Sequence, residues 1–459
     1  MIDCLAVNAA PGEIRIALLD GERTVELHHH RAGNVSTVGN LYLGRVNGFL
    51  SGANGAFIDL GLARPGFLNA GDARPITHGA IAPIGRYVDE GAAVLVQVSR
   101  DGLQGKGPRL TKRPNLVGRY LVFSPGQGGI RVSRRITNKA ERERLMRLVG
   151  EAHEADDRFT LRGAAQGADA DAILRDMATL HDAWGEALKL RKGASPPACL
   201  WTAPDPFERA LMDHPGVRRV VIDDAAMLAR ARRLMAGSDA APELYRSTEP
   251  IFESFAVEAA LEEALAARVA LPSGAAVIFE ETNALCAIDV DGGGATGSSL
   301  RINLEAAPVI ARQLRLRAIG GVIVIDFLRM ARRGHRRAVI EAMGAALADD
   351  RDAVAPEGFS KLGLVEMRRR RTGPSLAEFL NDAGDAHKNP VTTALDIARA
   401  AARELDIASP GAAVLRVAPE VAQAFTPALV AALKAAAGRI VTPAADTAYQ
   451  RQEWRIDLP

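Results

Sequence analysis

Cysteine, aromatic residues and long apolar runs are all scarce in this chain of 459 residues. The three cysteines, Cys4, Cys199 and Cys286, lie far apart and form no C-x-x-C pair, which excludes a zinc finger and a dithiol redox centre. No apolar run approaches the roughly 20 residues that span a bilayer. The amino terminus carries Asp3 instead of a basic start followed by a long apolar run. We therefore expect a soluble, cytoplasmic protein with reduced thiols and no membrane span.

Net charge is also small, at +2. Such a balance does not indicate a nucleic-acid partner by itself, so any such prediction must come from where the charges cluster. Hydrophobic residues make up 48% and charged residues 24%, which is typical of globular proteins, and the length predicts three or more domains.

The amino-terminal half has the pattern of short strands. Alternating apolar runs separated by Pro-Gly and Asp-Gly predict a small sheet over 1–37. Closely spaced, glycine-rich strands over 38–117 predict a small barrel. Residues 118–199 mix strands with two stretches of helical apolar spacing, which predicts an α+β unit.

The carboxy-terminal half alternates strands and helices. A strand and two helices are predicted over 200–264. A hairpin, a glycine-rich loop, a helix and the apolar strand GVIVIDF follow. Because that strand has no polar alternation, we expect it to be central and covered on both faces. The tail from 390 predicts a helix, a strand and a helix in a small terminal domain, so the fold class is multidomain α/β.

Two aspartates stand where apolar strands end: Asp289 after ALCAI and Asp326 after VIVI. Magnesium typically takes one or two protein carboxylates and keeps waters and phosphate oxygens as its other ligands. Asp291, on the same face as Asp289, is placed to support such a site. The alternative is that these residues cap the following turn or helix, and the sequence pattern leaves both interpretations open.

The second feature is electrostatic. Residues 102–140 contain no Asp or Glu, and their cations predict a track for phosphates, with a solvated face as the alternative. In the preceding barrel, Phe57 and Phe67 flank a turn, where exposed rings would stack on bases and buried rings would belong to the core. The cations of the segment are Lys106, Arg109, Lys112, Arg113, Arg119, Arg131, Arg134, Arg135 and Lys139.

Three further groups carry weaker signals. His28, His29 and His30 alternate between strand faces, which disfavours a shared metal. The run Arg368 to Arg371 is typical of a solvated basic edge, and the more specific alternative is that it contacts nucleic acid. Cys286 is expected in the core rather than as a nucleophile.

Several stretches resemble the bacterial ribonuclease E/G family: NLYLGRV, GAFIDLG, VSRR, LPSGAAVIFEETNALCAIDVD, NLEAAPVIARQLRLRAIGGVIVIDF and KLGLVEMRRRRTGPSL. The resemblance implies an endoribonuclease that cleaves single-stranded RNA by magnesium-assisted phosphodiester hydrolysis in RNA processing or decay. A non-catalytic RNA-binding protein on the same scaffold is the alternative.

The resemblance also implies how the chain is divided. A ribonuclease-H-like region is expected in two separated segments, 1–37 and 200–264. Between them lie an OB-fold RNA-binding domain (38–117) and a 5′-sensor region (118–199). A deoxyribonuclease-I-like catalytic region (265–385) and a small carboxy-terminal domain (390–459) follow.

Individual residues are assigned by the same resemblance. Asp289 and Asp326 match the family's magnesium ligands, for which Mn²⁺ can substitute, and Asp291 adjoins them as a third catalytic candidate. Phe57 and Phe67 match the OB-fold aromatics. Lys106 and Lys112 fall in the family's basic RNA-contact segment, and Arg134 and Arg135 in VSRR join them as predicted RNA contacts. Arg162 matches the arginine that senses a 5′-monophosphate.

Three departures qualify these assignments. Asp291 stands where the family usually has Asn, which adds negative charge. Gly163 follows Arg162 where Thr is common, which removes one hydroxyl donor and predicts a weakened preference for a 5′-monophosphate. The segment after PSL at 374–376 has no cysteine. No structural zinc is therefore expected, and any homo-oligomer is expected to form without a zinc link. The chain resembles the short, ribonuclease-G-like form of the family.

Overall fold

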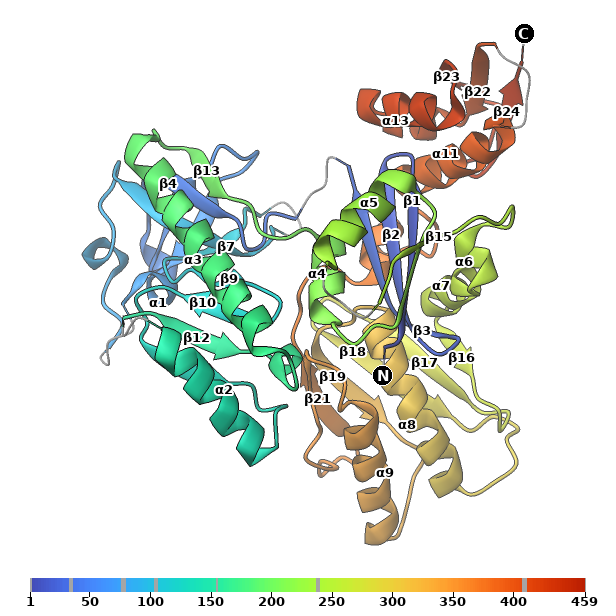
Figure 1. Cartoon of the computed structure of the whole chain (residues 1–459). Helices are drawn as coiled ribbons and strands as arrows, with labels where there is room; N and C mark the ends of the chain where they lie inside the picture. The colour runs from blue at the N-terminus through green and yellow to red at the C-terminus, as the bar shows by residue number, and fades with distance from the viewer. Residues whose placement is uncertain are drawn as a thin grey trace. The chain divides into compact units, whose positions relative to one another are not determined.

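The computed structural model describes residues 2–32, 36–75, 80–102, 106–153, 156–236, 240–406 and 411–458. Backbone contacts divide the chain into two compact units, Met1–Val35 with Val217–Pro459 and Ser36–Gly216. Figure 1 labels the helices and strands of both units.

The second unit contains the predicted barrel. Strands β4 (Leu41–Leu50), β5 (Gly55–Asp59), β6 (Gly66–Asn69), β8 (Arg109–Thr111) and β7 (Ala93–Arg100) pair in that order. Because β7 also pairs with β4, the five strands close on themselves. Alternate side chains, including Ile58, Leu68 and Leu110, are fully buried inside and α1 (Ala70–Ala73) follows β6.

A short strand that the sequence pattern did not reveal extends this sheet. β13 (Ala198–Trp201) pairs antiparallel with the first residues of β4. Its four residues are too few to show an alternation, and its partner lies more than 150 positions earlier in the chain, so only the folded topology identifies it.

An α+β layer completes this unit, as predicted. Its sheet has the order β11 (Gly129–Val132), β12 (Arg158–Leu161), β10 (Leu121–Ser124) and β9 (Leu116–Val117). Helices α2 (Lys139–Ala152) and α3 (Ala170–Gly193) bury Leu145, Val149, Ile173 and Met177 in one core with it. Asn138 and Asp169 accept backbone N–H bonds and so cap the two helices. Helix α4 (Pro206–Asp213) follows β13.

The first unit begins with a sheet built from two separated stretches of chain. β1 (Cys4–Ala10) pairs antiparallel with β2 (Glu13–Asp20) and parallel with β14 (Arg219–Ile222). β3 (Arg23–Arg31) and β15 (Glu243–Leu244) are the edges. The chain thus leaves this sheet, forms the whole other unit and returns. Helices α5 (Ala225–Leu234), α6 (Ile251–Ser254) and α7 (Val257–Leu265) follow the return strand.

A six-stranded mixed sheet carries the aspartates. Its order is β16 (Arg268–Ala270), β17 (Ala276–Glu281), β18 (Leu285–Asp291), β19 (Gly321–Asp326), β21 (Val365–Arg369) and β20 (Ala353–Val354). Helix α8 (Ser299–Leu316) connects β18 to the parallel β19, and α9 (Arg333–Ala346) follows β19. Both helices pack on the same face of the sheet, where they lie side by side (Figure 1).

Strand β19 is central, as predicted, but the expectation that both its faces are covered is wrong. Ile323 and Ile325 are buried under the helices, whereas Val322, on the opposite face, is 41% exposed. The reason is that only one helical crossover is used: β17 and β21 join as antiparallel strands, so no second helix layer is required.

The carboxy-terminal domain has more sheet than predicted. After α10 (Leu376–Leu380), α11 (Pro390–Asp406) leads into a sheet of order β23 (Val441–Ala445), β22 (Ala413–Val417) and β24 (Trp454–Asp457). Helices α12 (Pro419–Ala424) and α13 (Pro427–Ala437) pack with α11 in its core. Within the ranges described above, no helix combines the length and apolar character needed to cross a membrane.

Candidate functional site

Asp289 and Asp326 are brought together by strand register. They face each other directly on the neighbouring parallel strands β18 and β19. Their neighbours Ile288 and Ile325 are buried beneath the helices, so both aspartates project from the opposite, exposed face. The crossover through α8 fixes this arrangement, because it makes both strands end at the same edge of the sheet.

Electrostatics separate Asp289 from an ordinary surface carboxylate. Partial burial and then the negative charges of Asp326 and Asp291 raise the pKa of Asp289. No side chain in the described part of the chain pairs with either Asp289 or Asp326. Neither residue caps the next helix, because Ser298 is the N-cap of α8 and Arg332 that of α9. Two such carboxylates fit a hard divalent cation, which would relieve their repulsion.

Asp291 is in a different position. Its carboxylate accepts a 2.8 Å bond from Arg268 and a 2.9 Å bond from the backbone N–H of Gly293, and these contacts lower its pKa. The turn-capping interpretation therefore applies to Asp291. Arg268 was missed from the sequence because its place depends on a three-strand register, in which Arg268 faces Ile278 and Ile278 faces Asp289.

Replacing Arg268 with Gln is expected to move the acidic limit of divalent-cation binding to higher pH. The guanidinium offsets the charge of Asp291, and without it that charge further raises the pKa of Asp289. A carboxylate must be deprotonated to hold a cation, so cation binding is present above this pKa and lost as the pH falls through it. The measurement is the pH profile of Mn²⁺ binding by Arg268→Gln beside that of Arg232→Gln, a change in an exposed arginine on α5. Identical profiles would rule out the coupling.

Asn303 fixes the loop that follows Asp326. It is completely buried in α8, and its side-chain amide donates to the carbonyl of Leu328 at 2.8 Å and accepts from the N–H of Leu328 at 3.0 Å. A buried amide with both bonds satisfied holds backbone firmly. The sequence could have indicated this role of Asn303, because Asn303 is a polar residue on the apolar face of the amphipathic helix α8.

Phe57 and Phe67 lie on the outside of the barrel. They are paired across β5 and β6, with ring centroids 5.6 Å apart, and Phe57 is 38% exposed. The Arg109 guanidinium lies 5.5 Å from the Phe67 ring. Gly55 is required here, since a Cβ at this position would meet the Phe67 ring at 2.3 Å. Phe57 is thus exposed and Phe67 is partly buried, and neither ring is a member of the barrel core.

The basic segment is not one uniform track. Lys112 donates to the carbonyl of Tyr87 at 2.7 Å, and Arg113 pairs with Asp72 at 3.3 Å. Burial lowers the pKa of Lys112. Arg119 is partly buried. The exposed members are Lys106, Arg109, Arg131, Arg134, Arg135 and Lys139.

Arg162 is tied down at several points. Its guanidinium donates to the carbonyls of Gly118, at 2.6 Å, and Arg119, at 3.2 Å, and forms an ion pair with Asp213 at the end of α4. Arg135 lies beside Gly163, because a Cβ built on that glycine would be 3.7 Å from the Arg135 Cδ. The sequence did not point to Asp213, which follows Arg162 by 51 positions.

The weaker candidates belong to the scaffold. Cys286 is core, as predicted, and burial raises its pKa to about 12. The side chains of His28 and His29 differ in exposure, 43% against 5%, as expected for opposite strand faces. In the run from 368 to 371, three arginines pair with carboxylates: Arg369 with Asp350, Arg370 with Asp352 and Arg371 with Glu378.

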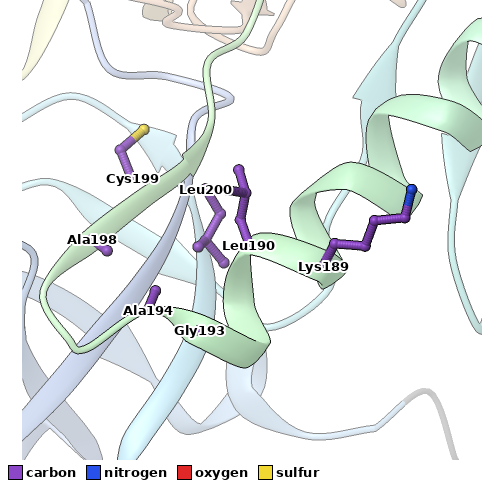
Figure 2. Close-up of a pocket in the computed structure, with 7 residues that line it drawn as sticks. All are labelled: Lys189, Leu190, Gly193, Ala194, Ala198, Cys199 and Leu200. Atoms are coloured by element: carbon purple, nitrogen blue, oxygen red, sulfur yellow. The ribbon is translucent and has the colours of Figure 1, made fainter.

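An apolar hollow of about 480 Å³ lies between the end of α3 and β13. Figure 2 shows the side chains of Leu190 and Leu200 between the helix and the strand, with the Cys199 thiol nearby. The one charged residue in its lining, Lys189, donates to Glu186. The hollow offers no set of polar groups for chemistry.

Comparisons with known proteins identify relatives of this chain. Residues 115–372 match the model of the Ribonuclease E/G family. The chain is 36% identical to ribonuclease G of Escherichia coli strain K12 over 405 residues, 83% of each chain. It is 34% identical to ribonuclease G of Haemophilus influenzae over 82% of this chain and 81% of that one. Ribonuclease E of Nostoc sp. is 36% identical over 79% of this chain and 54% of its own length. The chain therefore belongs to the ribonuclease E/G family.

Proposed function

We propose that the protein is a magnesium-dependent endoribonuclease that cleaves single-stranded RNA in RNA processing or decay. The observation that carries the proposal is the facing pair Asp289 and Asp326, exposed on adjacent strands and without a side-chain partner in the described residues. Family membership supports the same activity.

Asp289 and Asp326 would hold the metal, and their chemistry fits it. Two carboxylates at one sheet edge match the number of protein ligands that Mg²⁺ usually takes, and Mn²⁺ accepts the same oxygens. Bound there, the cation would supply an activated water and charge stabilisation at the phosphate. The protein's role is to hold the two carboxylates in fixed register on neighbouring strands. Asp291 would act on Asp289 through its charge, since its own oxygens are bonded to Arg268 and Gly293.

The barrel would bind the RNA strand as an OB-fold. Phe57 is exposed and Phe67 is partly exposed outside the barrel core, and bases would stack on these rings without sequence preference. Lys106, Arg134 and Arg135 would contact phosphates. Lys112, although it lies in the same basic segment, donates to the carbonyl of Tyr87 and would mainly stabilise the fold.

We also propose which regions of the family the parts of this chain correspond to. The sheet that combines β1–β3 with β14 would be the interrupted ribonuclease-H-like region, and the six-stranded sheet the deoxyribonuclease-I-like catalytic region. Residues 118–199 would be the 5′-sensor region. Any homo-oligomer would form without a zinc link, because the segment AEFLNDAGDAHKNP that follows PSL has no cysteine.

The direct experiment is incubation of the full chain with a short single-stranded RNA and with DNA of the same sequence, with and without Mg²⁺. We expect internal cleavage of the RNA alone, only with the metal, to products that carry 5′-phosphates. RNA binding without turnover in either Mg²⁺ or Mn²⁺ would favour the competing function, a non-catalytic RNA-binding protein.

For the 5′ end, we expect Asp213→Asn to strengthen the preference for 5′-monophosphorylated RNA. The carboxylate of Asp213 competes with a phosphate for the Arg162 guanidinium, and asparagine removes the competing charge. The preference is the ratio of kcat/KM on 5′-monophosphate and 5′-hydroxyl RNA, and the expected gain is a few-fold. Asp205→Asn, at the other end of α4, is the control. No gain beyond that control, or equal rates on both substrates in all three proteins, would contradict this role of Arg162.

A further inference from the structure

Five arginines stand within nine residues directly after Asp326: Arg329, Arg332, Arg333, Arg336 and Arg337. They occupy the loop from β19 to α9 and the first turns of α9. All five are exposed. The segment therefore places a dense positive patch at the strand end that carries Asp326.

The five do not have the same surroundings. Arg336 donates to the carbonyl of Met330 at 2.9 Å, and Arg337 pairs with Glu341 at 2.7 Å. For Arg329, Arg332 and Arg333, which we call the arginine triplet, the structure records no ion pair with any carboxylate that it describes. Their charges are therefore available to a partner.

The backbone beneath the triplet is firmly held. The side chain of Asn303 forms hydrogen bonds with the backbone carbonyl and N–H of Leu328. The side chains of Phe327 and Met330, on either side of Leu328 in the chain, are buried. A rigid base reduces the entropy lost when the arginines engage a ligand. Arg329 is three residues beyond Asp326, which places the two Cα atoms within about 11 Å of each other.

The triplet also opposes local stability. Helix α9 begins at Arg333 without a side-chain cap bond and with no acidic residue in its first turn. Cations at a helix amino terminus are unfavourable because that end already has partial positive charge. An anion bound beside the triplet would remove this conflict, and phosphate suits it because guanidinium groups bind phosphate oxygens in pairs.

We infer that the arginine triplet binds backbone phosphates of the RNA strand next to the one held at Asp289 and Asp326. This inference rests on the proposed function and adds to it a second RNA contact, on the catalytic unit rather than the barrel. The triplet positions the substrate and does not act in the bond-breaking step.

The test is RNA binding by the full chain, measured with a labelled single-stranded RNA in chelator over a range of salt concentrations. We expect Arg329→Gln/Arg332→Gln/Arg333→Gln to weaken binding by roughly tenfold and to lower the salt slope of log Kd by about 2, since each contact to a single strand contributes about 0.7. The matched control, Arg232→Gln/Arg233→Gln/Arg246→Gln, removes three exposed arginines from the same unit and should leave the slope unchanged.

Replacement of the triplet by lysine keeps the charge and should keep most of the slope. An unchanged slope in the triplet variant, or the same loss in the matched control, would overturn the inference. Cleavage of RNA by the wild-type protein in Mg²⁺ separates this inference from the proposed function. If the wild-type protein cleaves RNA but the triplet variant keeps the wild-type salt slope, only the role of the arginine triplet is rejected. If the triplet variant has a lower salt slope but the wild-type protein does not cleave RNA, the proposed function is rejected and the triplet is retained as an RNA-binding site.

Discussion

Asp289→Asn and Asp326→Asn are each expected to slow RNA cleavage by about 10³-fold or more. The two carboxylates face each other in register and no side chain of the described residues neutralises them. Asparagine preserves their size but removes the charge that a divalent cation needs. Metal stabilisation of transition-state charge is worth several kcal/mol, and each 1.4 kcal/mol is about a factor of ten in rate. The measurement is single-turnover cleavage at saturating Mg²⁺.

Asp291→Asn is the matched control for this pair. It makes the same chemical change on the same strand, but Asp291 is bonded to Arg268 and to the N–H of Gly293. We expect its rate to stay within about tenfold of wild type, since only a charge next to the ligands changes. A loss as large as that of Asp289→Asn would make Asp291 a ligand in its own right. Undiminished cleavage by Asp289→Asn or Asp326→Asn would remove the basis of the proposed site.

The double variant Phe57→Ala/Phe67→Ala is expected to weaken binding of single-stranded RNA by about 10²-fold. Stacking of a base on an aromatic ring contributes about 1–3 kcal/mol, and on the barrel exterior Phe57 is exposed and Phe67 is partly exposed. Because neither ring fills the barrel core, the variant should stay folded. Binding is measured by fluorescence anisotropy, and thermal unfolding checks the fold.

Two further variants separate stacking from simple apolar contact. Phe57→Tyr/Phe67→Tyr keeps both ring faces and should bind nearly as well as wild type. Phe57→Leu/Phe67→Leu keeps apolar surface without a ring face and should behave like the alanine variant. If the leucine protein binds like wild type, the rings do not act by stacking.

Much of the architecture could be predicted from local pattern. Glycine-rich alternation over 38–117 indicated the barrel, and the apolar run before Asp326 indicated a central strand. The pairing of Asp289 with Asp326 needed one more fact, the parallel register of β18 and β19, which a helical crossover of ordinary length makes natural. These features depend on residues that are close in sequence or joined by one crossover.

What local pattern missed depends on contacts between distant residues. The Arg268 bond to Asp291 requires the register of three strands, and the Asp213 bond to Arg162 joins residues 51 positions apart. The exposed face of β19 was mispredicted because an apolar run indicates a buried strand but does not tell how many helices cover it. In each case the identity of the partner decides what a charged or apolar side chain does.

The most direct test of the central claim is metal rescue. Cysteine in place of Asp326 replaces a hard oxygen ligand by a soft sulfur, which disfavours Mg²⁺ and favours softer cations. We predict that Asp326→Cys is inactive in Mg²⁺ and that Mn²⁺ or Cd²⁺ restores RNA cleavage, whereas Asp326→Asn is restored by neither. Cleavage by Asp326→Cys in Mg²⁺ at the wild-type rate, or the absence of any rescue, would contradict metal ligation by Asp326.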